Sequence, residues 1–286
     1  MFSKRLIYTL RLPGRNLELG RRTLLFAVIN VTPDSFYDGG RYDSPGAGVE
    51  HALRLVEQGA DVLDIGGESS RPGAQSVSAQ VEIDRVLPVV EGIRRHSDIP
   101  LSIDTTKLEV ARACLAAGAD LINDISAFRF EPELAVEIAT TGAAVILMHS
   151  RGTPHTMQQL PPSPDILSDV TRTLAAAVAQ AFQSGISRDR ILIDPGVGFG
   201  KTAQDNLKIL QRLSLLSRFE LPVLVGTSRK SFIGKILDLP LEERLWGTAA
   251  TVAAAVLGGA HAVRVHDVVE NRQVCRIVDA ILEQDE

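Results

Sequence analysis

One pattern recurs along almost the whole chain: a short apolar segment, a polar loop, an amphipathic segment and then a glycine. Short runs of branched apolar residues between turn signals indicate buried strands, and apolar spacing near 3.6 residues indicates helices. The predicted strands lie at 24–29, 62–65, 101–103, 121–122, 144–147, 191–193, 223–225 and 262–265. The predicted helices lie near 47–59, 80–96, 107–117, 132–141, 165–184, 204–217, 242–258 and 269–283.

Eight regular strand–helix units favour an α/β fold of the (β/α)₈ TIM barrel type. An open doubly wound sheet is the alternative, but that fold rarely needs eight such units. The joints have one form, a glycine–alanine pair at 59–60, 118–119, 142–143 and 259–260. Each glycine is expected to end a helix in the left-handed conformation. Residues 1–22 are predicted to form a β-ribbon that plugs one end, and no linker divides 1–286, so we expect a single domain.

Composition narrows the class of protein. Of the 286 residues, 45% are hydrophobic and 23% are charged, and the net charge is -5. A chain of this length buries a sizeable core, and without basic blocks we expect no affinity for nucleic acid or a membrane surface. Cys114 and Cys275 fall in apolar helical segments, so both are expected to be reduced core residues of a cytoplasmic protein. No signal peptide is expected, because the basic N-terminus lacks an unbroken apolar run.

The segment from Arg190 to Lys201 combines a buried strand with an open loop. The strand ends on Asp194, and Pro195 and glycines at 196, 198 and 200 follow it. The end of the loop matches a P-loop, but Pro195 stands where the first glycine would be, and the dinucleotide fingerprint fails on glycine spacing. An acid at this point is either a turn former or a binding group at a strand end.

Polar side chains follow the predicted strands at almost every joint. In a barrel all carboxyl ends of the strands share one face. Because buried polar groups cost free energy unless they are paired, such a ring predicts a polar, flat ligand with amino, amide and ring N–H groups. Its members are Asn30, Asp104, Asn123, Asp194 and Lys230.

A phosphate site is predicted beside this ring. Arg71 follows the second strand, and Arg264 and His266 close the eighth; arginine suits bidentate phosphate contacts. The alternative for Arg264 is a solvated salt bridge to an acid such as Asp267. The six histidines show no metal-ligand spacing on a helix, and His51, His96 and His261 are expected at the surface or at caps.

Seven sequence blocks, in order along the chain, resemble dihydropteroate synthases. They are INVTPDSF (29–36), GGESSRPG (66–73), SIDT (102–105), IND (122–124), DPGVGFGK (194–201), GTSRKS (226–231) and RVHD (264–267). The resemblance implies an enzyme that joins 6-hydroxymethyl-7,8-dihydropterin diphosphate to 4-aminobenzoate, releasing diphosphate and giving 7,8-dihydropteroate for folate biosynthesis. It also implies Mg²⁺ and a cytoplasmic homodimer.

The resemblance implies specific roles for individual residues. The pterin-binding residues are Asp104, Asn123, Asp194 and Lys230; the diphosphate-binding residues are Ser70, Arg71, Arg264, Val265 and His266. The residues for 4-aminobenzoate are Phe36, Ser70, Pro72, Phe199, Lys230 and Ser231, and Asn30 touches the metal. The catalytic residues are Asp104, Lys230, Arg264 and His266. Ser70 departs from the pattern, since many members have threonine there.

The chemistry of the implied reaction favours a dissociative path. Loss of diphosphate leaves positive charge on the methylene carbon, and a carboxylate near the ring stabilises that charge. Asp104 is the predicted carboxylate. Three alternatives remain: a pterin-binding methyltransferase, an aldolase with a Schiff base on Lys230, and a pterin-binding barrel without catalysis.

Overall fold

The barrel strands of the computed structural model match the predicted strands to within one or two residues. The structure describes residues 5–32, 45–69, 73–157 and 159–284. The strands are β3 (Leu24–Asn30), β4 (Val62–Gly66), β5 (Leu101–Asp104), β6 (Leu121–Asp124), β7 (Ala144–Met148), β8 (Ile191–Asp194), β9 (Leu224–Gly226) and β10 (Ala262–Val265).

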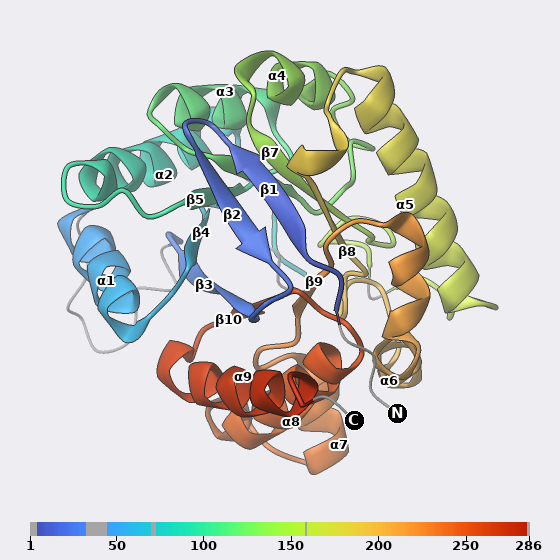
Figure 1. Cartoon of the computed structure of the whole chain (residues 1–286). Coiled ribbons are helices and arrows are strands. Elements are labelled where there is room, and N and C mark those ends of the chain that lie inside the picture. Colours follow the sequence, from blue (N-terminus) through green and yellow to red (C-terminus); the bar gives the residue numbers. More distant parts are fainter. Residues whose placement is uncertain (1–4, 33–44, 70–72, 158, 285–286) are drawn as a thin grey trace.

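These eight strands form one parallel sheet in the order β8-β7-β6-β5-β4-β3-β10-β9. Its two outer strands meet through a parallel bridge between Ile193 and Val223, where the Ile193 N–H donates to the Pro222 carbonyl at 3.0 Å. The sheet therefore closes into the predicted TIM barrel, with the helices arranged around it (Figure 1).

The helices are α1 (Pro45–Gln58), α2 (Ala79–Arg94), α3 (Leu108–Ala116), α4 (Leu134–Thr141), α5 (Ile166–Gln183), α6 (Ala203–Gln211), α7 (Ser231–Leu237), α8 (Leu245–Leu257) and α9 (Val268–Leu282). Short 3₁₀ turns are η1 (Arg188–Arg190), η2 (Leu213–Phe219) and η3 (Leu241–Glu243). The main core lies between the helices and the outer faces of the strands. In α2, for example, Val86, Val89, Val90 and Ile93 are fully buried at the spacing of one helix face.

The glycine joints have the predicted geometry. Gly59, Gly118, Gly142 and Gly259 have φ angles between 75° and 101°. Glycine adopts this left-handed region without the steric penalty that a Cβ atom would bring. These joints let each helix stop and turn directly into the next strand.

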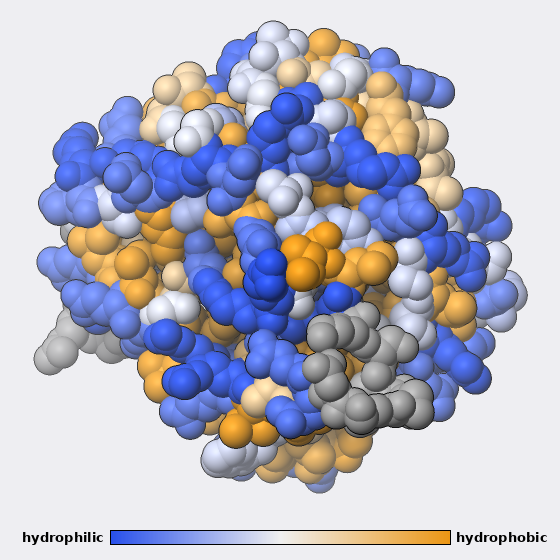
Figure 2. All heavy atoms as spheres, in the orientation of Figure 1, coloured by the Kyte–Doolittle hydropathy of each residue, from blue (hydrophilic) through white to orange (hydrophobic). Residues whose placement is uncertain are grey.

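The N-terminal ribbon closes one end of the barrel, as predicted. Strands β1 (Tyr8–Leu12) and β2 (Arg15–Leu19) pair antiparallel and lie across the barrel opening in Figure 1. Leu10, Leu12 and Leu19 are buried in one cluster with the first residues of several strands, such as Leu24 and Leu121. The ribbon therefore covers the amino ends of the strands. Figure 2 shows that this face is largely hydrophilic, with hydrophobic atoms in scattered groups.

Two local predictions were wrong. The helix expected over 204–217 ends at Gln211, and a 3₁₀ segment, η2, continues to Phe219. Helix α7 was not predicted, because seven residues are too few to show a clear helical period. It begins directly after Lys230, which fixes the backbone of that lysine at a helix N-terminus.

Helix α6 begins where its sequence indicates. The Thr202 side chain accepts the Asp205 N–H at 3.1 Å, and the Asp205 carboxylate accepts the Thr202 N–H at 2.9 Å. This reciprocal cap satisfies two N–H groups that would otherwise lack partners. Within the described residues, no helix is both long enough and apolar enough to cross a bilayer.

Candidate active site

The carboxyl ends of the barrel strands carry a compact group of buried charges. The Arg264 Nε lies 2.7 Å from the Asp64 Oδ2, and its Nη1 lies 3.6 Å from the Asp194 Oδ2. Asn123 Nδ2 donates to the Asp104 Oδ1 at 2.9 Å. One guanidinium and three carboxylates, from β4, β5, β8 and β10, therefore meet at one end of the barrel.

Burial shifts the ionisation of this group. Burial and then the neighbouring Asp64 charge raise the pKa of Asp104 to about 7. Burial also raises the pKa of Asp194, although Arg264 and Lys230 oppose that rise. For Arg264, burial disfavours the charge, but the surrounding carboxylates raise its pKa above the usual value. The three carboxyl groups outnumber the one guanidinium. Their mutual repulsion and their burial therefore oppose ionisation of all three at once.

Several buried polar atoms in this region lack a partner within the described ranges. They are Asp64 Oδ1, Ser102 Oγ, Asn123 Oδ1, His149 Nδ1 and Arg264 Nη2. Buried polar groups are normally hydrogen-bonded, and each exception calls for an explanation. A polar ligand in the barrel mouth would provide donors for the oxygens and an acceptor for the guanidinium.

Lys230 stands over the loop that follows β8. Its ammonium donates to the Val197 carbonyl and lies 4.4 Å from the centroid of the Phe199 ring. Burial lowers the pKa of Lys230 to about 8, while Asp194 opposes that shift. Ser231, the next predicted residue, is exposed at the start of α7. Phe199, Lys230 and Ser231 therefore lie on one side of the rim.

His266 and Val265 continue the rim at the end of β10. His266 is exposed, its Nδ1 lies 2.9 Å from the Ser228 Oγ, and its backbone N–H lies 3.2 Å from the same oxygen and donates to it. The alternative ion pair of Arg264 with Asp267 is wrong. Asp267 instead pairs with Arg229, with 3.0 Å between Arg229 Nε and the Asp267 Oδ2.

Asn30 ends β3 at the same rim and is half-buried. Four other predicted site residues lie outside the described residues, namely Phe36, Ser70, Arg71 and Pro72.

Asp64 belongs to the charged group but was not predicted. It lies inside β4, in register with Val28 and Ser102, rather than after the strand. The prediction considered only residues at the ends of strands or after them, so it overlooked an acid with apolar neighbours on both sides. A carboxylate within an otherwise fully buried strand was the available signal.

The expectation for His261 was also wrong. It is buried under the ribbon, where its Nδ1 accepts the Val223 N–H at 3.2 Å. Burial lowers its pKa to about 4, so the ring is neutral. His149, after β7, is likewise buried, and burial lowers its pKa to about 2. Neither imidazole is in a suitable state for proton transfer near pH 7.

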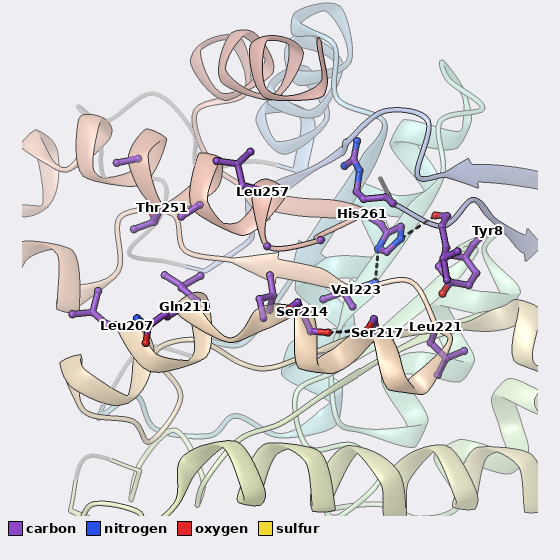
Figure 3. A pocket seen from close by; sticks show the side chains of 18 residues that line it. Tyr8, Leu207, Gln211, Ser214, Ser217, Leu221, Val223, Thr251, Leu257 and His261 are labelled. Atoms are coloured by element: carbon purple, nitrogen blue, oxygen red, sulfur yellow. Dashed lines mark hydrogen bonds between the residues drawn. The ribbon is translucent and has the colours of Figure 1, made fainter. Parts of the chain in front are cut away.

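A pocket of about 730 Å³ lies away from the rim, between α6, η2 and α8 (Figure 3). Tyr8, Val223 and His261 lie at one side of it, and Leu207, Thr251 and Leu257 come from the helices. None of the candidate site residues lines it. Its lining is mainly apolar, so it differs in chemistry from the charged rim.

Comparison with known proteins gives a consistent result. A family model described as pterin binding enzyme matches residues 26–266. The dihydropteroate synthase of Synechocystis is 48% identical over 265 residues, covering 92% of each chain. That of Escherichia coli is 44% identical over 269 residues, covering 94% of this chain and 95% of the relative.

Solved structures agree with the sequence matches. Yersinia pestis dihydropteroate synthase, in complex with a sulfonamide drug, superposes with a TM-score of 0.91 at 42% identity, covering 96% of this chain and all of that one. The Xanthomonas albilineans enzyme with 4-aminobenzoic acid gives 0.91 at 41% identity, covering 98% of this chain and 100% of that one. This chain therefore belongs to the pterin-binding enzymes and, among them, to the dihydropteroate synthases.

Proposed function

We propose that the charged group at the rim is the site where this enzyme joins a dihydropterin to 4-aminobenzoate. The reaction breaks the bond between the pterin methylene carbon and the diphosphate oxygen. It forms a bond from that carbon to the amine nitrogen, and one proton leaves to solvent. The cluster of Asp64, Asp104, Asp194 and Arg264, with unpaired buried polar atoms beside it, is the observation that carries this proposal.

The pterin is proposed to lie in the barrel mouth against Asp104, Asn123, Asp194 and Lys230. Carboxylate oxygens accept hydrogen bonds from amino and ring N–H groups, and the free Asn123 Oδ1 is a further acceptor. The Lys230 ammonium donates to a ring carbonyl. A flat heterocycle with hydrogen-bond donors along one edge and a hydrogen-bond acceptor on another would match these side chains.

Asp104 is proposed to stabilise the transition state. Positive charge develops on the methylene carbon as diphosphate leaves, and a fixed carboxylate in a buried site favours that charge. The amine of 4-aminobenzoate is neutral at pH 7 and already carries a lone pair, so it is proposed to attack without a dedicated base. Positioning and charge placement then supply the rate enhancement.

The leaving diphosphate is proposed to lie toward Arg264, Val265 and His266, together with Ser70 and Arg71. The exposed His266 ring at the end of β10 is accessible to an anion. The 4-aminobenzoate is proposed to lie beyond the pterin, against Phe199, Lys230 and Ser231, with Phe36, Ser70 and Pro72 covering it. An aromatic wall and an ammonium suit a flat benzoate.

Mg²⁺ is proposed as the metal, with Asn30 as its protein contact. In the described part of the chain, no three His, Cys, Asp or Glu side chains are grouped to hold an ion. Mg²⁺ often needs only one or two protein oxygens when waters and substrate phosphates complete its shell. Asn30 offers one oxygen on β3, beside the strand that carries Arg264, so it fits that mode. The bound ion would neutralise charge on the diphosphate.

The direct test uses the purified protein with 6-hydroxymethyl-7,8-dihydropterin diphosphate, 4-aminobenzoate and Mg²⁺. Diphosphate and dihydropteroate are expected to appear in equal amounts. Release of diphosphate without dihydropteroate would contradict the proposed condensation. Sodium borohydride is expected to trap no adduct, which distinguishes this reaction from Schiff-base chemistry on Lys230.

We also propose that the protein acts in the cytoplasm as one domain per chain and pairs as a homodimer. Cys114 and Cys275 are buried free thiols, which suits a reducing compartment. The outer surface of α6, α7 and α8 exposes large apolar side chains beside the apolar pocket of Figure 3. They are Leu207, Ile236, Leu237 and Trp246, the last with 79% of its surface exposed. Exposed apolar patches mark association surfaces.

Trp246→Asp is expected to dissociate the dimer. A central tryptophan commonly contributes ~2 kcal/mol or more to an interface, so the dissociation constant should rise by about 30-fold or more. Analytical ultracentrifugation should show wild type at twice the 30.9 kDa chain mass and the variant shifted toward one chain. Val136→Asp is the control, because α4 lies on the other side of the barrel in Figure 1 and Val136 is exposed. Equal masses for both variants would contradict this surface.

A further inference from the structure

Lys201 is a buried cation that the proposed reaction does not use. It ends the glycine-rich segment after β8, where a P-loop lysine would point at a phosphate. Here its ammonium points inward instead. Its hydrogen bonds in the described part of the chain all go to backbone carbonyl oxygens: Gly196 at 2.7 Å, Phe199 at 3.1 Å and His149 at 3.2 Å.

This arrangement matches the charged form of the lysine. An ammonium has three N–H donors, and three carbonyls accept them, whereas a neutral amine has only two. Burial lowers the pKa of Lys201 well below its usual value, so keeping this charge inside the protein is costly. The three carbonyl contacts offset part of that cost.

The three carbonyls belong to two different loops. His149 follows β7, while Gly196 and Phe199 lie in the loop after β8. The backbones of these loops are in close contact, because a Cβ atom on Gly196 would lie 1.8 Å from the His149 carbonyl oxygen. Lys201 therefore ties the β8 loop to its neighbour at both ends of the turn from Gly196 to Phe199.

That turn is also the contact surface of Lys230. The Lys230 ammonium donates to the Val197 carbonyl, and the Phe199 ring lies beneath it at 4.4 Å. Gly198 leaves room for the Lys230 side chain, since an added Cβ atom would lie 2.8 Å from its Cδ. The position of Lys230 thus depends on the conformation of residues 196–199.

We infer that Lys201 is a positioning residue, which holds the loop after β8 so that Val197 and Phe199 present Lys230 to the substrate. This inference rests on the proposed role of Lys230. It extends that role by assigning the adjacent buried lysine to the support of the site rather than to phosphate binding.

A double-mutant cycle tests the inference. Lys201→Met is expected to lower kcat/KM for the pterin substrate about tenfold, the factor that corresponds to ~1.4 kcal/mol. Lys230→Met is expected to lower it further, and the double variant should match Lys230→Met within about twofold. Such non-additivity is expected when one residue acts through another. Lys208→Met, a change at an exposed lysine on α6, is the control and should leave kcat/KM unchanged.

Fold-changes that multiply in the double variant would overturn the inference. Lys201→Gln, which keeps two donors, replaces Lys201→Met if that variant does not fold, and its loss should be smaller than tenfold. If neither variant folds, Lys201 serves global stability and the inference is wrong.

Hydrogen exchange separates this result from failure of the proposed function, because it needs no activity. Lys201→Met should speed exchange at the Phe199 and Lys230 amides, which donate to Gly196 and Thr227, while β3 to β6 stay protected. Uniform loss of protection would contradict the inference. An inactive wild type would instead contradict the proposed reaction.

Discussion

Asp104→Asn is expected to lower kcat by about 10²- to 10³-fold while the fold is retained. The change removes the negative charge proposed to stabilise the methylene cation, and loss of one such electrostatic contact has about this effect in other enzymes. Asparagine keeps the shape of the side chain, and its oxygen can still accept from Asn123, which lies 2.9 Å away in the wild type. Steady-state kinetics with both substrates measures the effect.

The pH dependence of the same variant provides a second measurement. Burial raises the pKa of Asp104 to about 7, so the carboxyl group takes up a proton more readily in the folded protein than in the unfolded chain. Its contribution to stability is therefore present below pH ~4 and lost as the pH rises through about 7. Asp104→Asn should stabilise the free protein at pH 8, by on the order of 2 kcal/mol. Wild-type kcat/KM should rise through about pH 7, and the variant should lack that rise.

Asp84→Asn is the matched control, because Asp84 is exposed on α2 and bonds only to Gln80 among the described hydrogen bonds. Its kinetics and unfolding should equal those of the wild type. Full turnover in a folded Asp104→Asn variant would remove Asp104 from the proposed role. A wild-type rise with pH that persists in the variant would assign that titration to another group.

Arg264→Met is expected to reduce both stability and activity. The guanidinium is the cation that faces Asp64 and Asp194 in the barrel mouth, at 2.7 and 3.6 Å. Removing one partner of a buried ion pair leaves uncompensated charge and typically costs about 3–5 kcal/mol. The proposed diphosphate contact is lost as well, so kcat/KM should fall by about 10³-fold or more. Urea unfolding and steady-state kinetics measure the two effects.

The sign of the pH effect follows from the carboxylates. Arg264 lowers the pKa of both Asp104 and Asp194, so both groups bind protons more readily in the variant. The stability difference between wild type and variant should therefore be larger at pH 8 than at pH 5. Adding Asp64→Asn should recover part of the stability without recovering activity. Arg212→Met, at an exposed arginine after α6, is the control. Equal stability of Arg264→Met and wild type at pH 8 would contradict the ion-pair account.

Much of the fold followed from local pattern. Each barrel strand was predicted to within one or two residues, because a buried strand needs a short run of branched apolar residues between turn signals. The joints at Gly59 and Gly118 were also predictable, since a helix that must turn directly into a strand needs a left-handed residue. Helix α7 was missed because seven residues leave too little periodicity to detect.

The candidate site was predictable only in part. Residues at strand ends, such as Asp104 and Asp194, were found because all carboxyl ends of a parallel barrel share one face. Asp64 was missed because it lies within its strand, where the apolar pattern conceals a single acid. The ring of polar side chains by itself indicated only a flat polar ligand. The identity of the substrate was predicted from the resemblance to dihydropteroate synthases.

By itself, the sequence determined the strands, the joints between units and the side chains placed at the barrel rim, because each depends on neighbours along the chain. Only the tertiary structure decided which side chains and backbone groups interact with one another. Arg264 on β10 pairs with Asp64 on β4, about 200 positions away along the chain and two strands over in the sheet, rather than with Asp267 three residues on. Lys201 turns inward to carbonyls of two loops, and His261 is buried under the ribbon. The packing of strands and loops in the barrel sets these distances, and no local pattern records which distant residues that packing brings together.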